Sequence, residues 1–220
     1  MPGWLGSLWY EACFWSSFTA LTLGWSLRIR GRQNIPRTGP VLLIANHQST
    51  LDPVLIGLAA PRHLSYLARK TLFRNRAFAW LIRSLNAVPI DQDGVGKEGL
   101  QTVLKLLQQG RAVLVFPEGS RTETGKIDAL KPGIHLLIKR VQAPIVPIGI
   151  AGAFEAMPRG QHYAVPAPLF LPAGRSALAV SVGRAIDGRR YADMPRPQVL
   201  AELFALLQCE YDKAERLRRK

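Results

Sequence analysis

The sequence predicts an α/β fold: a mixed, mostly parallel sheet flanked by helices, with a helix or helix pair at the N-terminus. Short apolar runs alternate along the chain with segments whose apolar residues recur at helical spacing, the pattern of α/β proteins. Two of these runs lead directly into polar clusters, as strands do where an α/β sheet builds its site. The 220 residues, 48% of them hydrophobic, suffice for one domain with its own core.

The N-terminal segment, residues 4–27, contains four of the five tryptophans and a single charged residue, Glu11. The uncharged stretch from Ala12 to Leu27 would measure about 24 Å as a helix, short of a bilayer core of about 30 Å. Tryptophan is enriched at the headgroup interface. We therefore expect residues 1–27 to form a membrane-associated helical segment, in one piece or two, that lies in one leaflet. A membrane-spanning helix and a helix packed on the core are the alternatives.

Residues 28–220 are expected to form the main domain, with a C-terminal helix packed on it. Its first residues include four arginines that would meet lipid phosphates if the preceding helix inserts: Arg28, Arg30, Arg32 and Arg37. We predict strands at 41–46, 63–68, 87–91, 112–116, 144–150 and 177–183, and helices at 52–60, 73–85, 100–107, 133–142 and 196–215. Pro89 makes the third strand short or places it at an edge, because proline cannot donate to the ladder.

A polar cluster, NHQSTLD at 46–52, follows the first predicted strand and holds His47 and Asp52 about one helical turn apart. A neutral imidazole suits proton abstraction near neutral pH. A carboxylate bonded to the other ring nitrogen fixes the tautomer and stabilises the imidazolium. The pair therefore predicts a general base with His47 and Asp52 as catalytic residues. The alternative is a helix cap and a turn before Pro53, without catalysis.

A second polar cluster, FPEGSRT at 116–122, follows the strand predicted at 112–116. Gly119 lets the backbone approach a ligand closely. Arg121 can grip a phosphate through two parallel hydrogen bonds. The cluster therefore predicts a binding loop for an anionic, oxygen-rich substrate, and an ordinary loop with an ion pair between Glu118 and Arg121 is the alternative.

Four blocks, taken in this order, resemble the lysophospholipid acyltransferase family, of the 1-acylglycerol-3-phosphate acyltransferase type. The blocks are NHQSTLD at 46–52, ARKTLF at 68–73, FPEGSRT at 116–122 and APIVPIGI at 143–150. The resemblance covers roughly residues 28–185 and implies that 28–220 form an acyltransferase domain. It also implies a non-covalent mechanism in which the His–Asp dyad activates the hydroxyl of the acceptor.

The resemblance further implies that the glycerol phosphate of the acceptor is bound near the second polar cluster, with Lys70 as an additional phosphate contact. The predicted substrate-binding residues are Asn46, Lys70, Glu118, Gly119, Ser120, Arg121 and Thr122. One position departs from the family pattern, because Gln92 stands where many members carry an arginine. That departure leaves the identity of the acceptor open.

The formal charge of +14 calls for an acidic partner. Residues 53–90 contain no Asp or Glu, and their six cations are interleaved with apolar and aromatic residues. Such a surface suits anionic lipid headgroups and a phosphopantetheine donor, either acyl-CoA or an acidic acyl carrier protein. No zinc finger, RNP or helix-turn-helix pattern is present, so we expect no nucleic-acid partner. A solvated basic face without a partner is the alternative.

The sequence thus favours transfer of a fatty acyl group from an acyl thioester to a lysophospholipid hydroxyl, most simply that of 1-acylglycerol-3-phosphate. The rivals are another lysolipid acceptor, a hydrolase that uses the same dyad, and a non-enzymatic basic protein that binds lipid or nucleic acid. We expect no cofactor beyond acyl-CoA or acyl carrier protein as co-substrate, and no metal, because no His, Asp and Glu set has ligand spacing. Two distant cysteines indicate a reducing compartment, so we expect the cytoplasmic face of the inner or plasma membrane; acyl length and oligomeric state stay open.

Overall fold

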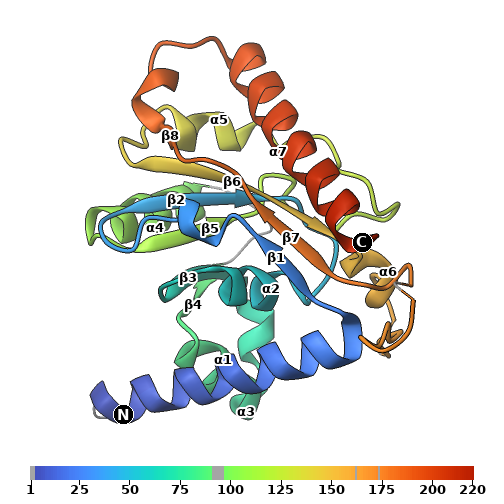
Figure 1. Cartoon of the computed structure of the whole chain (residues 1–220). Helices are drawn as coiled ribbons and strands as arrows, with labels where there is room; N and C mark the ends of the chain where they lie inside the picture. Colours follow the sequence, from blue (N-terminus) through green and yellow to red (C-terminus); the bar gives the residue numbers. More distant parts are fainter. Residues whose placement is uncertain (1–2, 91–96, 162, 173) are drawn as a thin grey trace.

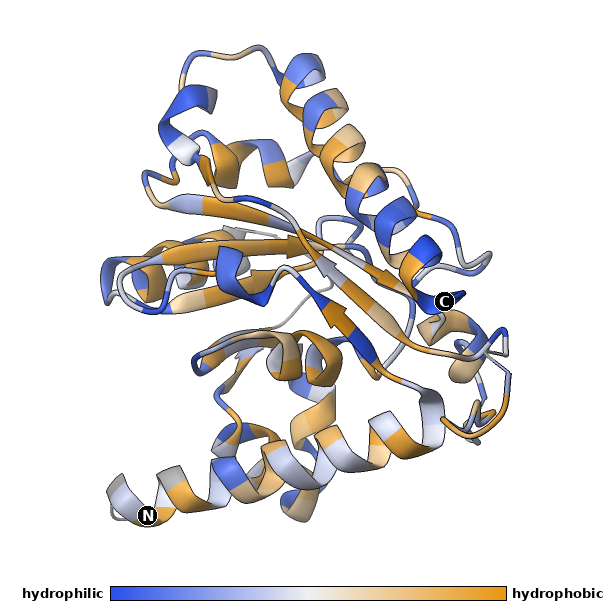
Figure 2. Cartoon of the chain, in the orientation of Figure 1, coloured by the Kyte–Doolittle hydropathy of each residue, from blue (hydrophilic) through white to orange (hydrophobic). Residues whose placement is uncertain are grey.

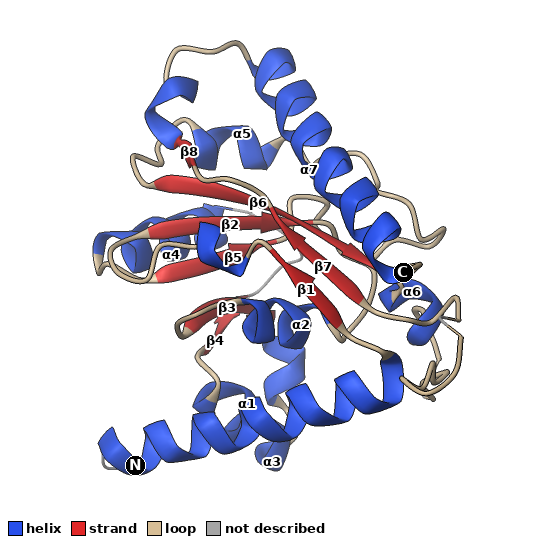
Figure 3. Ribbon diagram, viewed as in Figure 1, coloured by secondary structure: helices blue, strands red, loops and turns tan. Residues whose placement is uncertain are grey.

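The computed structural model describes residues 3–90, 97–161, 163–172 and 174–220. These residues fold into a twisted sheet with helices on both faces (Figure 1, Figure 3). The strands are β1 (Arg28–Arg30), β2 (Val41–Ala45), β3 (Leu64–Arg69), β4 (Ala87–Ile90), β5 (Ala112–Val115), β6 (Pro144–Ala151), β7 (Ala179–Val182) and β8 (Ile186–Asp187). The helices are α1 (Gly3–Trp25), α2 (Asp52–Ala59), α3 (Arg76–Ser84), α4 (Lys97–Gln108), α5 (Gly133–Ile138), α6 (Ala153–Ala156) and α7 (Arg196–Arg218), with short 3-10 turns η1 (Arg32–Asn34), η2 (Lys70–Phe73) and η3 (Gly188–Tyr191).

The sheet has the strand order β1-β7-β6-β2-β5-β3-β4, with β8 paired to β6. Among the described strands, β6 pairs antiparallel with β7 and β8, and the other pairs are parallel. The predicted mixed, mostly parallel sheet is therefore confirmed. Strand β4 lies at an edge and contains Pro89, as expected for a residue that cannot donate to the ladder.

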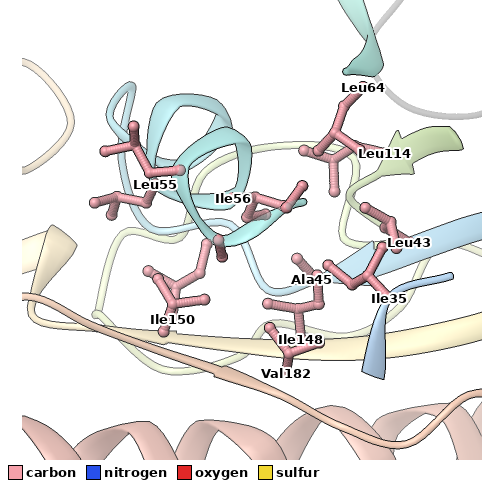
Figure 4. Packing of buried hydrophobic residues seen from close by; sticks show 14 of the residues in the cluster. Ile35, Leu43, Ala45, Leu55, Ile56, Leu64, Leu114, Ile148, Ile150 and Val182 are labelled. Carbon is pink, nitrogen blue, oxygen red and sulfur yellow. The ribbon is translucent and has the colours of Figure 1, made fainter. Parts of the chain in front are cut away.

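Strand β2 lies inside the sheet, and its fully buried side chains alternate between two apolar layers. Leu43 and Ala45 face the layer that contains Leu55 of α2 (Figure 4). Leu42 and Ile44 face the opposite layer, which is covered by α4, α5 and α7. A strand buried on both faces reads as a continuous apolar run, and the central strands are accordingly mostly orange in Figure 2.

Helix α1 runs along one side of the molecule, beside α2 and α3 (Figure 1). It is a single continuous helix, not the broken pair that was the alternative prediction. Phe14, Phe18 and Trp25 pack against the core, whereas Trp4 and Trp15 are 66% and 60% exposed. Within the described part of the chain, no helix combines the length and hydropathy that crossing a bilayer requires. One side of α1 therefore belongs to the fold, and the other presents apolar rings outward.

Two of the arginines that follow α1 donate hydrogen bonds to backbone carbonyls. Arg28 and Arg30 lie in β1, a strand that the sequence pattern does not predict, and pair with β7. The Arg28 guanidinium donates from Nη1 to the carbonyl of Arg218, 3.0 Å away, and Arg32 donates to the carbonyl of Ala60. These contacts tie the segment to the C-terminal end of α7 and to α2. Whether these arginines meet lipid phosphates stays a prediction.

Candidate active site

The two polar clusters meet at the carboxyl edge of the parallel strands. Strands β2, β5 and β3 are adjacent and parallel, so the loops that follow them leave the sheet at one edge. His47 follows β2, Phe116 follows β5, and Arg69 ends β3. The backbone N–H of Thr122 donates to the carbonyl of His47 at 2.8 Å, which joins the two loops directly.

The predicted His–Asp pair is formed. The Nδ1 atom of His47 lies 2.7 Å from Oδ2 of Asp52. Because a carboxylate only accepts, Nδ1 carries the hydrogen and Nε2 is left as the acceptor that a general base needs. The imidazole also stacks on Phe116, with ring centroids 3.9 Å apart and an interplanar angle of 14°. The ring is thus held at its edge by the carboxylate and at its face by an aromatic side chain.

Asp52 is fully buried at the first turn of α2. Its Oδ2 also accepts the backbone N–H groups of Gln48 at 2.6 Å and Ser49 at 2.7 Å. Burial raises the pKa of Asp52, while the hydrogen bonds from His47, Ser49 and Gln48 oppose that rise. The predicted turn before Pro53 is therefore present, but its carboxylate serves the imidazole as well as the turn.

Glu118, predicted to bind substrate, instead holds the two loops together. Its side chain is 2% exposed. Oε1 accepts the backbone N–H of His47 at 2.6 Å, and Oε2 accepts that of Asp128 at 2.8 Å. Burial raises the pKa of Glu118 to about 8, despite these two hydrogen bonds. The ion pair with Arg121, which was the alternative to a binding loop, is not among the contacts of the described residues, and the carboxyl group of Glu118 holds the backbone of His47.

A cavity of about 730 Å³ opens beside the dyad. Its polar end contains His47, Thr50, Arg69, Gly119, Ser120 and Arg121. Its apolar walls come from α1 (Tyr10, Cys13, Phe14, Ser17), α2 (Val54, Gly57, Leu58), α3 (Phe78, Leu81, Ile82, Leu85) and the strand ends (Tyr66, Leu67, Ala87, Ile90, Leu114). The lining of this cavity therefore combines His47 and a small cationic region with a much larger apolar part.

The cationic region contains more than the predicted Arg121. Partial burial lowers the pKa of Arg121, and the nearby guanidinium groups of Arg159 and Arg69 lower it further. Arg69 lines the cavity. Arg159 lies 3.2 Å from the carboxylate of Glu123. Cations that disfavour one another without a ligand are stabilised by an anion, so the cluster suits a phosphate group.

Comparison with known proteins agrees with this geometry. The model of the family described as Acyltransferase matches residues 26–151, more than half of the chain. The chain belongs to the acyltransferase family.

This acyltransferase is similar in sequence and in structure to individual members of the family. It is 27% identical, over 65% of its length and 71% of the relative, to the 1-acyl-sn-glycerol-3-phosphate acyltransferase of Bacillus subtilis. It is 32% identical to the enzyme of that name from Streptococcus pneumoniae, over 50% of this chain but only 41% of the relative. The crystal structure of the acyltransferase PlsC from Thermotoga maritima has the same fold, with a TM-score of 0.73 and 21% identity over 96% of this chain and 79% of that one.

Several predicted substrate contacts of the acyltransferase turn out to be occupied by the protein itself. Asn46 is 1% exposed and exchanges two hydrogen bonds with the backbone of Ile150, which fixes the end of β2 to β6. Thr122 is fully buried. Neither residue lines the cavity described around the dyad. Asn46, Glu118 and Thr122 therefore lie outside the cavity lining, whereas Gly119, Ser120 and Arg121 belong to it; which of them contact the substrate stays a prediction.

The residue of this segment that lines the cavity is Arg69 and not Lys70, which the sequence predicts as a phosphate contact. The ammonium of Lys70 lies 3.5 Å from the carboxylate of Glu98, and each side chain is about half exposed. Arg69 is the last residue of β3 and Lys70 is the first of η2, and only Arg69 of the two belongs to the cavity lining. Gln92, the departure from the family pattern, lies outside the described residues.

The described residues contain no group of three His, Cys, Asp or Glu side chains that could hold a metal ion. The expectation of metal-independent chemistry stays a prediction.

Proposed function

We propose that this acyltransferase moves a fatty acyl group from an acyl thioester to the free hydroxyl of 1-acylglycerol-3-phosphate, which yields phosphatidic acid. The observation that carries the proposal is the position of His47, bonded to Asp52 at 2.7 Å, at the junction of an apolar cavity and a cluster of arginines. A lysophospholipid has that same division into an anionic headgroup and an apolar chain. The names of the relatives support the same acceptor.

In this proposal His47 acts as the general base. Its Nε2 takes the proton of the acceptor hydroxyl while that oxygen attacks the carbonyl carbon of the thioester. The C–S bond then breaks, and the departing thiolate takes the proton back from the imidazolium. General-base catalysis of this kind contributes about 10²–10⁴-fold to the rate, and correct placement of the two substrates contributes much of the rest.

The arginine cluster is the reason for proposing an acceptor that contains a phosphate. Arg121 and Arg69 lie at the polar end of the cavity, where they can hold the phosphate and leave the free hydroxyl facing His47. The apolar walls between α1, α2, α3 and the strand ends are suited to a fatty acyl chain. The thioester carrier, either acyl-CoA or acyl carrier protein, leaves as a thiolate in both cases, so both belong to the proposal.

A panel assay tests this function. Purified protein is supplied with acyl-CoA or acyl carrier protein and with 1-acylglycerol-3-phosphate, lysophosphatidylglycerol or lysophosphatidylcholine. We expect phosphatidic acid to be the main product and little free fatty acid to form. Thiol release at the same rate without acceptor would favour the rival hydrolase, and equal use of lysophosphatidylcholine would contradict the assignment of the arginines to a phosphomonoester.

We further propose that the protein is monotopic, with α1 lying in one leaflet. The outward side of α1 exposes Trp4 and Trp15. Next to its C-terminal end, the loop that contains Leu169 and Phe170 is hydrogen-bonded to the helix, and Phe170 is 83% exposed. Large apolar side chains in such positions mark a membrane or protein contact. The cytoplasmic side stays a prediction, based on the two free cysteines, Cys13 and Cys209.

Vesicle flotation tests the membrane contact. Deleting α1 would also remove cavity walls, so the sharper variant is Trp4→Ser/Phe170→Ser, with Leu136→Ser/Phe204→Ser as a control on exposed residues of α5 and α7. Burial of one large apolar side chain contributes about 1.5–3 kcal/mol, so partitioning should fall about tenfold or more per residue. High salt should not release the wild-type protein, because apolar burial is not screened. If both variants lose vesicle binding equally, the surface that contains Trp4 and Phe170 is not the membrane contact.

A further inference from the structure

A second cavity, of about 490 Å³, lies outside the catalytic one, between the N-terminal half of α1 and α3. Its lining consists of Gly6, Trp9, Phe73, Arg76, Ala79, Trp80, Arg83 and Ser84. None of these residues lines the catalytic cavity. We call this cavity the α1–α3 groove. Its size falls in the usual range of ligand pockets.

Helix α3 separates the two cavities because its side chains divide between two faces. Phe78, Leu81 and Leu85 line the catalytic cavity. Arg76 and Arg83 line the groove, as does Trp80 between them. Positions three or four apart share a helix face, so the apolar set and the cationic set lie on different sides of one short helix. The groove is therefore not an extension of the acyltransferase site.

The charge of the groove is unbalanced. Its lining contains two guanidinium groups and no carboxylate. Neither Arg76 nor Arg83 forms an ion pair with a carboxylate among the described residues, and the nearest aromatic contact places the Arg83 guanidinium 5.1 Å from the centroid of Phe73. Two arginines in one concave site, without an acidic partner, indicate an anionic ligand with phosphate-like oxygens.

The rest of the groove is aromatic. The rings of Trp9 and Trp80 lie 5.3 Å apart, and the indole N–H of Trp9 donates to Ser84 Oγ at 3.0 Å. Trp80 is 49% exposed. On the same helix, Leu8, directly before Trp9, is 60% exposed, and Trp4, five residues before it, is 66% exposed. An anionic group held by the arginines would thus be adjacent to an apolar surface large enough for a hydrocarbon chain.

We propose that the α1–α3 groove binds one anionic phospholipid, with the phosphate between Arg76 and Arg83 and the acyl chains along the outward side of α1. The bound lipid would fix α1 against α3 and orient the protein on an anionic bilayer. The site goes beyond the proposed acyl transfer, and binding there requires neither the dyad nor a thioester. An acyl-CoA also carries phosphates, so the test separates a lipid from the donor.

The test uses the variant Arg76→Gln/Arg83→Gln and the control Arg37→Gln/Arg140→Gln. The control removes the same number of charges from two other exposed arginines, which have no ion pair among the described residues. The probe is dihexanoyl phosphatidylglycerol below its critical micelle concentration, compared with dihexanoyl phosphatidylcholine and inorganic phosphate. A ligand that binds the folded state raises Tm. We expect phosphatidylglycerol to raise Tm more than the other probes do, in the wild type and the control, and the groove variant to lose most of that rise.

A single variant and a kinetic measurement complete the test. The single variant Arg76→Gln, at an exposed side chain, should weaken the response even if the double variant folds poorly. The KM for acyl-CoA should change less than twofold in the groove variants. The proposal is overturned if phosphatidylcholine acts as well as phosphatidylglycerol, if the control loses the response equally, or if the groove variants raise the KM for acyl-CoA while the lipid response persists.

Discussion

The loop after β2 and the loop after β5 each hold a buried carboxylate that accepts backbone N–H groups, yet the two carboxylates hold different parts of the site. Asp52 binds the imidazole of His47 and two N–H groups of its own turn. Glu118 binds the backbone of His47 and that of Asp128, in a different loop. Asp52 therefore holds the imidazole of His47, and Glu118 holds the backbone of the loop that contains His47.

The largest effect on the transfer rate is expected for a change of His47, the residue that both carboxylates contact. His47→Ala removes the general base, so the transfer rate should fall about 10²–10⁴-fold. Product formation is measured at saturating donor and acceptor, with circular dichroism and vesicle binding as controls for the fold. Near-normal turnover would remove His47 from the mechanism.

Asp52→Asn should be nearly as severe. The amide can present an N–H to Nδ1 in place of an acceptor, which would leave the imidazole in the wrong tautomer. With its Nδ2 in the place of Oδ2, it would also face the N–H donors of both Gln48 and Ser49 with another donor. We expect the rate to fall about 10²–10⁴-fold while the KM values change little. A loss seen mainly in KM would mean that Asp52 serves substrate binding instead.

Arg121→Ala tests the cationic end of the cavity. A lost hydrogen bond to a charged group costs about 1.5–3 kcal/mol, which corresponds to about 10–150-fold in the KM of the acceptor. Arg69→Ala should act in the same direction, and Lys70→Ala, outside the cavity lining, should change the acceptor KM less than threefold. Steady-state kinetics with the donor saturating provides the comparison. If Lys70→Ala raises the acceptor KM as much as Arg69→Ala does, the assignment of Arg69 rather than Lys70 to the phosphate is wrong.

Glu118→Gln sharpens the comparison of the two carboxylates. The amide would accept one backbone N–H and oppose the other, which costs about 1–3 kcal/mol of stability. We expect a transfer rate about tenfold lower, because the backbone of His47 loses an anchor while the imidazole keeps Asp52. Denaturant unfolding and kinetics measure the two effects. A rate loss as large as that of Asp52→Asn would show that Glu118 takes part in the chemistry.

The pH dependence of stability tests the ionisation of Glu118 without reference to the transfer rate. The pKa of Glu118 is raised from 4.5 to about 8 by burial. Between these values the folded state holds a proton that the unfolded state has lost, so stability falls as pH rises from about 5 to 8. Unfolding free energies of wild type and Glu118→Gln should therefore converge over this range. A constant difference would mean that Glu118 ionises near its ordinary pKa.

The sequence by itself determined the α/β class, the order of most elements and the pairing of His47 with Asp52. These features are local: burial on both faces makes β2 and β5 continuous apolar runs, and Asp52 lies five residues beyond His47, close enough for one turn to join them. Such patterns depend on residues close together in the sequence and do not depend on the order of strands in the sheet.

Only the tertiary structure decided which polar residues face the cavity. Asn46, Glu118 and Thr122 look like site residues in the sequence, but each is buried. Asn46 and Glu118 bind backbone groups of Ile150 and His47, which come from other parts of the chain. Arg69 faces the cavity because β3 is placed beside β5. A buried polar group must find a hydrogen-bond partner, and the adjacency of strands distant in the sequence determines which partner that is.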